Sequence, residues 1–181
     1  MVGELTVHGG IAATTVAEAA AGDADALARI VGAHHDDMAR ICYVICGDQD
    51  LAQDAVQAAW PIAWRKLGSL RDPKRLRPWL MAVAANEARL LLRRQRRHQV
   101  VEIEVADIGS HRGDPAARAA LTDLSVALRR LSPDDRTLLA LRHVAGFDAT
   151  QIGRELGMSA SGVRSRLARL LAHLRSELQD A

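Results

Sequence analysis

The chain has 181 residues, of which 49% are hydrophobic but only 3% aromatic, and its formal net charge is +2. This length allows one large or two small domains, and the abundance of Ala, Leu and Arg favours helices over strands. No run approaches the roughly 20 apolar residues of a membrane span, and the first residues lack the parts of a secretory signal, so we expect a cytoplasmic protein.

Acidic and basic side chains alternate in blocks along the sequence. Residues 1–70 carry 4 basic and 9 acidic side chains, whereas residues 71–97 carry 9 and 2. Residues 98–135 carry 4 and 7, and residues 136–181 carry 7 and 4. Two basic blocks separated by an acidic one predict two separate contacts with a polyanion.

The N-terminal part begins with a lead-in, residues 1–13, which has no periodicity and is predicted to be disordered. A helical domain is predicted from residue 14 to residue 97. Within it, Asp23 favours a helix start and Gly47 a helix end, because Asp caps free amides and Gly accepts a left-handed backbone. Asp48 or Asp50 then opens the next helix, which ends near Leu67.

One face of that second helix combines acids and amides with large aromatic side chains. Asp54 and Gln57 lie one turn apart, and Trp60 and Trp64 continue nearby. Such a face is typical of a protein–protein hot spot, although tryptophans more often belong to the core. Pro61 lies inside the same helix, where its ring removes a hydrogen bond.

A polar loop, Gly68–Lys74, leads into a long helix that is predicted to end near Arg97. One face of this helix carries Asn86, Arg89, Arg93 and Arg96. Its predicted buried residues are Trp79, Leu80, Val83, Leu90 and Leu91. The basic face suits a nucleic-acid backbone, and the alternative is an ordinary solvated helix face.

Residues 98–115 contain glycines and a proline and are predicted to form a flexible linker. A second helical domain follows over residues 116–178. Within it, Ser132-Pro133 is a strong helix start, since Ser caps and Pro fits the first turn. The fold is thus expected to be all-α, with two small helical domains.

Residues 148–174 have the form of a helix-turn-helix, with Gly157 in the turn and Ser159 placed to cap the second helix. The residues of that helix that must face the core are Val163, Leu167, Leu170 and Leu174. The outer face then presents Ser161, Arg164, Ser165, Ala168 and Arg169.

No acid occurs from Ser159 to Arg175, so the outer face suits the major groove of DNA. Arg142, at the end of the preceding helix, is a candidate phosphate contact. The alternative is a solvated helix of an ordinary bundle. The hypothesis that both basic helices bind DNA requires that their arginines face away from the chain's own acids.

Cys42 and Cys46 lie one helical turn apart, close in sequence to His34 and His35. They are expected to be small buried hydrophobes. A thiol or zinc sensor is the alternative, although a structural zinc site usually needs four ligands in tighter loop spacing. No catalytic set, phosphate loop or paired carboxylates are evident, so we expect a protein that is not an enzyme and needs no metal or cofactor.

Several runs of residues resemble bacterial sigma factors. The runs DLAQDAVQAAW at 50–60 and WRKL at 64–67 resemble region 2.2, and RPWL at 77–80, AAN at 84–86 and LRR at 92–94 resemble regions 2.3 and 2.4. In the second domain LSP at 131–133, QIG at 151–153, LGMS at 156–159 and VRSR at 163–166 resemble region 4. The short chain with these two domains resembles the extracytoplasmic-function (ECF) group.

The resemblance implies a transcription initiation factor that binds core RNA polymerase through its β′ clamp helices and β flap, and promoter DNA, both duplex and melted. The implied polymerase contacts are Asp54, Gln57, Trp60 and Trp64. The implied contacts with the −10 element are Ser69, Arg71, Lys74, Arg75, Asn86, Arg89 and Arg93. Those with the −35 element are Arg142, Ser161, Arg164, Ser165 and Arg169. An anti-sigma factor is a further partner that the resemblance admits.

Four positions depart from the family's usual pattern, namely Pro61, Pro78, Gly153 and Gly162. A glycine costs up to about 1 kcal/mol in a helix interior, and Gly162 also lacks the hydroxyl expected near the DNA.

Two other classes of protein remain open from the sequence. The first is a dimeric helix-turn-helix repressor or activator that binds its operator without polymerase. The second is a helical interaction protein or thiol sensor that uses the cysteines and histidines.

Overall fold

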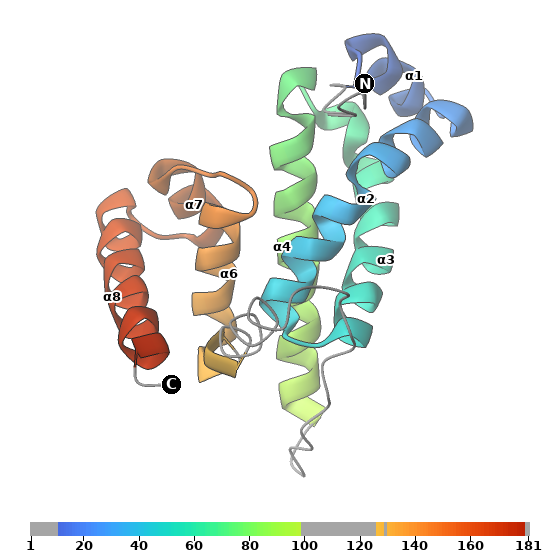
Figure 1. Ribbon diagram of the computed structural model, residues 1–181. Helices are drawn as coiled ribbons and strands as arrows, with labels where there is room; N and C mark the ends of the chain where they lie inside the picture. The colour runs from blue at the N-terminus through green and yellow to red at the C-terminus, as the bar shows by residue number, and fades with distance from the viewer. Residues whose placement is uncertain (1–10, 99–125, 129, 180–181) are drawn as a thin grey trace, which may run out of the picture.

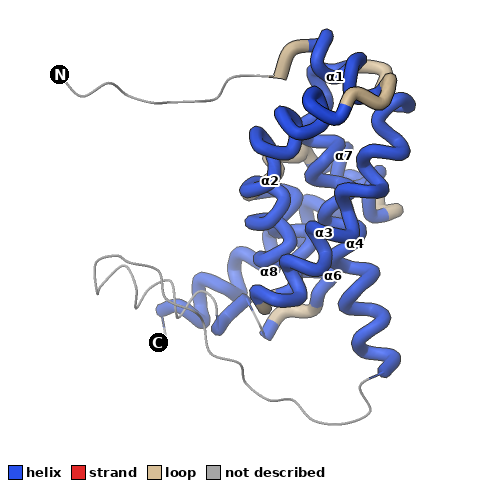
Figure 2. Tube along the Cα trace, turned by 90° about the vertical axis from the view of Figure 1, so that its right-hand side faces the viewer, coloured by secondary structure: helices blue, strands red, loops and turns tan. Residues whose placement is uncertain are grey.

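The computed structural model describes residues 11–98, 126–128 and 130–179. Every regular element in these ranges is a helix, and no strand occurs there (Figures 1 and 2). The all-α prediction is therefore confirmed for the described part. Most of the predicted lead-in and the predicted linker lie outside the described residues. None of the described helices is long and apolar enough to cross a membrane.

The N-terminal bundle consists of four α-helices and two short 3₁₀ turns. These are α1 (Ala13–Ala20), α2 (Ala24–Cys46), α3 (Gln49–Lys66), η1 (Leu67–Ser69), η2 (Pro73–Arg75) and α4 (Leu76–His98). Helix α2 packs against both α3 and α4, which also pack against each other. In this bundle α3 exposes the face that carries Asp54 and Gln57, whereas α4 also packs against the helix α6 (Pro133–His143).

The ends of these helices follow the predicted signals. Asp23 caps α2 by accepting a hydrogen bond from the Ala26 amide at 2.8 Å, and Gly47 ends it with a left-handed φ of 71°. Asp48, one of the two predicted openers, caps α3 through the Leu51 amide at 2.8 Å. Local capping chemistry therefore fixes where the loops between the helices begin.

The buried stripe of α4 differs in part from the predicted one. Its buried residues are Leu76, Leu80, Met81, Ala84, Ala85, Ala88 and Leu92. Of the five residues predicted to be buried, only Leu80 is; Trp79, Val83, Leu90 and Leu91 are partly buried, because alanines take up much of the buried stripe. Small side chains let the two helix backbones approach closely, and the Cys42 thiol donates to the Ala84 carbonyl oxygen at 3.5 Å.

The C-terminal bundle holds three further helices. They are α6 (Pro133–His143), α7 (Ala149–Leu156) and α8 (Ala160–Gln179). Ser132 caps α6, and Asp148 with Gln151 forms a capping box on α7. Gly157 ends α7 with a φ of 69°, which gives the tight turn of a helix-turn-helix.

Helix α6 is the part of the C-terminal bundle that faces the N-terminal one. It has α7 and α8 on one side and α2 and α4 on the other (Figure 1). Six consecutive residues of α6, from Arg136 to Leu141, are buried. A helix that is buried all round must have neighbours on every face. The two bundles are therefore packed together in this structure.

A charged pair joins α8 to the start of α6. The Arg166 Nε donates to Asp135 Oδ1 at 2.6 Å, and the Ser132 hydroxyl donates to Asp135 Oδ2 at 2.7 Å. Burial alone would raise the pKa of Asp135, but the hydrogen bonds from Arg166 and Ser132 outweigh it and hold the pKa below its usual value. Arg166 thus fixes how α8 sits on α6.

We predict that Asp135→Asn lowers the free energy of unfolding of the C-terminal bundle by about 1–3 kcal/mol at neutral pH, because it removes a charge-assisted hydrogen bond. A lowered folded-state pKa gives stability that is present above the unfolded pKa of about 3.9 and is lost as pH falls below it. Denaturant unfolding followed by circular dichroism from pH 7 to pH 3 measures this. Equal losses in wild type and variant at low pH would contradict it.

Gly153 in α7 packs directly against the backbone of Met158, in the turn that follows the helix. A β-carbon built on Gly153 would lie 2.5 Å from the Met158 carbonyl oxygen, which no side chain tolerates. The Met158 amide also donates to the Gly153 carbonyl oxygen at 2.8 Å. The absence of a side chain at Gly153 therefore lets the turn fold back onto α7 and set the start of α8.

We predict that Gly153→Ala destabilises the protein by about 1–3 kcal/mol, because the overlap with backbone exceeds the gain of about 1 kcal/mol from helix propensity. Gly32→Ala is the matched control, since it lies inside α2 with nothing within 4 Å of the added carbon. That control should be neutral or stabilising in thermal unfolding. A Gly153→Ala variant as stable as the Gly32→Ala variant would show that the turn has room.

Candidate functional site

The predicted recognition helix, α8, is built as the sequence indicates. The Ser159 hydroxyl accepts a hydrogen bond from the Gly162 amide at 3.1 Å and so caps the helix. The four residues predicted to face the core are buried, namely Val163, Leu167, Leu170 and Leu174. The core contacts of α8 therefore leave its opposite face open.

That open face carries the predicted hydroxyls and arginines. Ser161, Arg164, Ser165 and Arg169 are all exposed. Within the described residues neither Arg164 nor Arg169 has an acid within salt-bridge distance. Ser161 shares a hydrogen bond of 3.2 Å with Ser159 at the start of the helix. A positive face near a helix N-terminus is suited to phosphates and to guanine edges.

Arg142 is also exposed, but part of its guanidinium is already used. Its Nη1 donates to the Phe147 carbonyl oxygen at 3.0 Å, across the turn that contains Gly146. Arg142 therefore helps to shape the loop between α6 and α7. Its other nitrogens remain near the surface.

The Gly68–Lys74 segment is more ordered than the predicted loop, because it contains the two 3₁₀ turns η1 and η2. The Ser69 hydroxyl donates to the Lys66 carbonyl oxygen at 2.6 Å, and Asp72 accepts from the Lys74 amide at 3.0 Å. Arg71, Lys74 and Arg75 are exposed. Three cations therefore surround a short, locally hydrogen-bonded segment.

The basic face of α4 is not free. Arg89 Nη2 lies 3.3 Å from Asp134 Oδ1 and its Nε lies 3.4 Å from the same oxygen. Arg93 Nη2 lies 3.8 Å from that oxygen. The expectation that these arginines face away from the chain's own acids is wrong for Arg89 and Arg93, because α6 packs beside α4 and brings Asp134 to them. Asn86 stays exposed and its amide donates to Glu87 at 3.5 Å.

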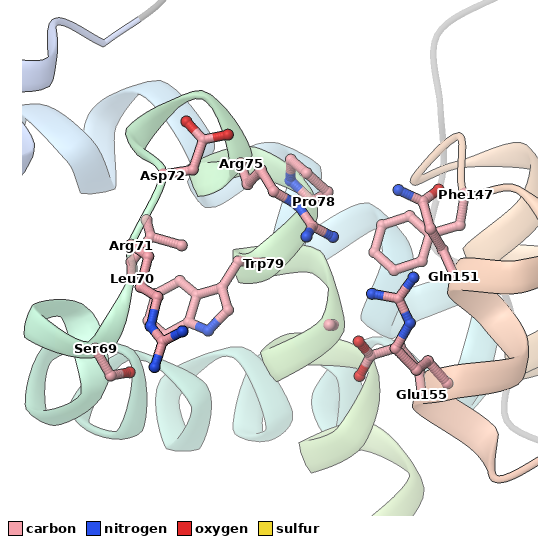
Figure 3. Close-up of a pocket in the computed structure, with 12 residues that line it drawn as sticks. Ser69, Leu70, Arg71, Asp72, Arg75, Pro78, Trp79, Phe147, Gln151 and Glu155 are labelled. Carbon is pink, nitrogen blue, oxygen red and sulfur yellow. The ribbon is translucent and has the colours of Figure 1, made fainter.

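A pocket of about 310 Å³ lies where the Ser69–Arg75 segment meets the C-terminal bundle (Figure 3). Its wall on the N-terminal side is formed by Ser69, Leu70, Arg71, Asp72, Arg75, Pro78, Trp79 and Ala82. Its opposite wall is formed by Phe147, Gln151, Arg154 and Glu155. The Ser69–Arg75 segment, which carries implied contacts with the −10 element, therefore faces α7 across the pocket.

The face of α3 that was predicted to bind a protein is largely exposed. Asp54 and Gln57 are exposed, and Trp64 has 46% of its surface accessible. Trp60 is only partly buried, and its Nε1 donates to His35 Nδ1 at 3.3 Å. The exposure of Trp64, on the same helix as Asp54 and Gln57, supports the hot-spot interpretation for this residue, whereas Trp60 also packs on the core.

The cysteines are buried, as expected. Burial raises the pKa of the Cys46 thiol to about 12 and raises that of Cys42 as well. Burial also lowers the pKa of His34. Thiols that stay protonated are poor nucleophiles and poor metal ligands, and no group of three potential ligands occurs among the described residues. The sensor hypothesis therefore has no support at this site.

Two residues that organise the site were missed by the sequence analysis. The sequence suggested no partner for either Asp134 or Arg166. Each pairs with a residue far away in sequence, Asp134 with Arg89 and Arg166 with Asp135. Periodicity within one helix carries no information on such partners.

Two family models match this chain in order. Residues 30–98 match Sigma-70 region 2, and residues 121–174 match Sigma-70, region 4. The chain is 34% identical over 169 residues to the probable RNA polymerase sigma factor RfaY of Xanthomonas campestris. That match covers 88% of this chain but only 42% of RfaY. It is 32% identical to the RNA polymerase sigma factor NccH of Alcaligenes xylosoxydans, over 90% of this chain and 92% of NccH.

Solved structures agree with this assignment. CnrH, in complex with the cytosolic domain of CnrY, aligns with a TM-score of 0.66 and 25% identity over 92% of this chain and 96% of CnrH. RpoE of Bartonella quintana, in complex with the anti-sigma factor NepR, aligns with a TM-score of 0.67 and 26% identity over 78% of this chain and 89% of RpoE. The chain therefore belongs to the sigma-70 family and its ECF group, the initiation factors that direct RNA polymerase to promoters.

Proposed function

We propose that the residues of this sigma factor divide into three contact surfaces, for core polymerase, the −10 element and the −35 element. The observation that carries this proposal is the exposed arginine face of α8, where neither Arg164 nor Arg169 has an ion pair within the described residues, on a capped helix-turn-helix. The other two surfaces lie on the region 2 bundle, on α3 and on the segment that leads into α4.

The polymerase surface is the exposed face of α3. Asp54 and Gln57 supply polar contacts to the β′ clamp helices, and Trp64 supplies apolar area. Trp60 is held in place by its hydrogen bond to His35. A large aromatic side chain ringed by polar groups is the usual composition of an interface hot spot.

The −10 surface combines the Ser69–Arg75 segment with α4. A base that leaves the stack needs a pocket and polar groups, and the polar atoms of this segment provide them. The exposed cations Arg71, Lys74 and Arg75 would hold the phosphates of the melted strand, and Asn86 its bases. Arg89 and Arg93 would join them only after leaving Asp134.

The −35 surface is the N-terminal half of α8. Arg164 and Arg169 reach base edges in the major groove, while Ser161 and Ser165 bond to phosphates or bases. Arg142 contacts the backbone beside them. Gly162 places no side chain between this helix and the DNA, so specificity rests on its neighbours.

The chain itself is proposed to be non-enzymatic and to act in the cytoplasm, where the polymerase works. Polymerase holds both DNA-binding units at once, so two weak contacts act together through effective concentration. An anti-sigma factor is a proposed regulator, because RpoE binds the anti-sigma factor NepR and CnrH binds the cytosolic domain of CnrY.

We predict that Arg164→Ala weakens binding of the holoenzyme to its promoter by about 1–3 kcal/mol, as expected for loss of a bidentate base contact. Arg175→Ala is the matched control, because Arg175 is exposed on the same helix about three turns beyond Arg164 and beyond the last proposed contact, Arg169. Binding is measured on duplex promoter DNA with intact and altered −35 sequences. The role assigned to Arg164 fails if both variants bind alike or if the loss is the same on both DNAs.

We predict that Trp64→Ala lowers the affinity for core polymerase by about tenfold or more, because truncation of a central hot-spot residue costs more than about 1.4 kcal/mol. Leu178→Ala removes another exposed apolar side chain, on α8, and should leave the affinity unchanged. Fluorescence anisotropy with labelled sigma factor and purified core enzyme gives both values. A full-affinity Trp64→Ala variant would remove α3 from the proposed interface.

A further inference from the structure

One arginine of the recognition helix is not part of its open face. The Arg166 Nε donates to Asp135 Oδ1 at 2.6 Å, whereas Arg164 and Arg169 form no ion pair within the described residues. The Arg166 side chain is 35% exposed and that of Asp135 is 18% exposed. Because the pair is partly buried, salt screens its attraction less than it screens a pair on the open surface.

The position of Arg166 on α8 places it at the edge of the proposed DNA-reading face. Successive helix residues are about 100° apart, so Arg166 lies about 60° from the exposed Arg169 around the helix axis. It lies about 60° on the other side from Val163, which is buried. Arg166 thus stands between the core stripe and the arginine face. The direction of its side chain therefore decides whether its charge joins the face that meets DNA.

Asp135 is itself fixed in place to hold that charge. The Ser132 hydroxyl donates to Asp135 Oδ2 at 2.7 Å, which leaves Oδ1 for Arg166. Burial raises the pKa of Asp135, but the hydrogen bonds with Arg166 and Ser132 outweigh burial and keep the pKa below its usual value. The charge of Arg169 acts in the same direction as these hydrogen bonds. Asp135 is therefore an oriented, ionised counter-ion on this flank of α8.

We propose that Asp135 is a specificity-determining residue for the −35 element, because it keeps the Arg166 guanidinium away from the DNA backbone while Arg164 and Arg169 reach the bases. This inference rests on the proposed −35 role of α8. Contacts with phosphates carry no sequence information, so a further free arginine beside the reading face would strengthen binding to every sequence.

The same carboxylate also seats α8 on α6. Its loss would loosen the contacts with bases and at the same moment free an arginine for contact with phosphate. Selection of one promoter among many competing sites depends on the ratio of specific to non-specific affinity. Asp135 protects that ratio from both sides.

The experiment measures binding of the holoenzyme to duplex promoter DNA at low temperature, where the DNA stays closed. One DNA has the intact −35 sequence and the other an altered one, and both are titrated over a range of salt concentrations. Asp135→Asn removes the charge of the acid and frees Arg166. Glu155→Gln is the matched control, because Glu155 is an exposed acid on α7 of the same bundle with no ion pair in the described part of the chain.

Asp135→Asn should bind the altered DNA about threefold to tenfold more tightly than Glu155→Gln does at about 0.1 M salt, since one added phosphate contact releases about one counterion. Its slope of log affinity against log salt concentration should be steeper by about 1. On the intact DNA the gain should be smaller, because α8 has lost the hydrogen bond that seats it. Discrimination between the two DNAs should therefore fall by about twofold to tenfold.

Arg166→Gln breaks the same hydrogen bond without freeing a cation. It should bind the altered DNA no more tightly than wild type and keep the wild-type salt slope. The double variant Asp135→Asn/Arg166→Gln has the net charge of the wild type and should lose the whole gain of Asp135→Asn. A merely structural role of the pair would instead change the two single variants alike.

Circular dichroism verifies that each chain is folded at the temperature of the measurement, because Asp135→Asn also lowers stability. Arg166→Gln keeps the proposal testable even if Asp135→Asn does not fold. A salt slope shallower by about 1 in Arg166→Gln would mean that Arg166 contacts DNA in the wild type, which would overturn the proposal.

Equal binding of the altered DNA by Asp135→Asn and Glu155→Gln would also overturn it, as would a gain that survives in the double variant. Arg164→Ala tests the −35 role of α8 separately, because it leaves the Asp135–Arg166 pair intact. Lost discrimination with Arg164→Ala, together with no gain for Asp135→Asn, would refute the role of Asp135 and leave the reading face in place. Full discrimination by Arg164→Ala would refute the role given to Arg164 on that face.

Discussion

Two neighbouring acids at the start of α6 hold most of the functional parts together. Ser132 caps the helix, and its amide dipoles favour negative charge in the first turn. Successive residues of a helix point about 100° apart, so Asp134 and Asp135 reach different partners. Asp135 binds Arg166 and fixes α8, whereas Asp134 binds Arg89 and fixes region 4 on region 2. The first turn of α6 thus contacts both basic helices, α8 through Asp135 and α4 through Asp134.

Small side chains make up much of the contact between α2 and α4. The contact between α2 and α4 relies on alanines and on the buried thiol of Cys42, and each bundle has its own buried stripe. Helix α6 extends this core, because its buried residues Arg136–Leu141 pack between α2 and α4 on one side and α7 and α8 on the other. The ion pair between Asp134 and Arg89 and the pocket opposite the Ser69–Arg75 segment lie at the same contact.

The sequence predicted the parts that depend on local chemistry and missed the parts that depend on distant pairs. Asp23, Gly47, Asp48, Ser132 and Gly157 each act as the predicted helix start or end, because capping involves residues within one turn. The inward and outward faces of α8 follow from its strict apolar spacing. On α4 the apolar residues fit more than one buried face, because alanines and leucines are mixed along the helix. The prediction wrongly placed the larger leucines Leu90 and Leu91 on the buried face. Asp134 and Arg89 are separated by 45 positions, so only the packing of α6 reveals their contact.

The two basic helices, which look equivalent in the sequence, differ because of where acids lie in space. The stretch from Ser159 to Arg175 has no acid of its own, and α8 lies on the outer side of α6, so Arg164 and Arg169 stay open. The basic face of α4 has few acids in its own sequence, but α6 supplies one from the other domain. The distribution of charge along the sequence therefore locates the basic side chains, but it does not show whether an acid from another helix pairs with them. Packing decides which cations are available: it leaves Arg164 and Arg169 exposed, whereas it places Arg89 and Arg93 beside Asp134.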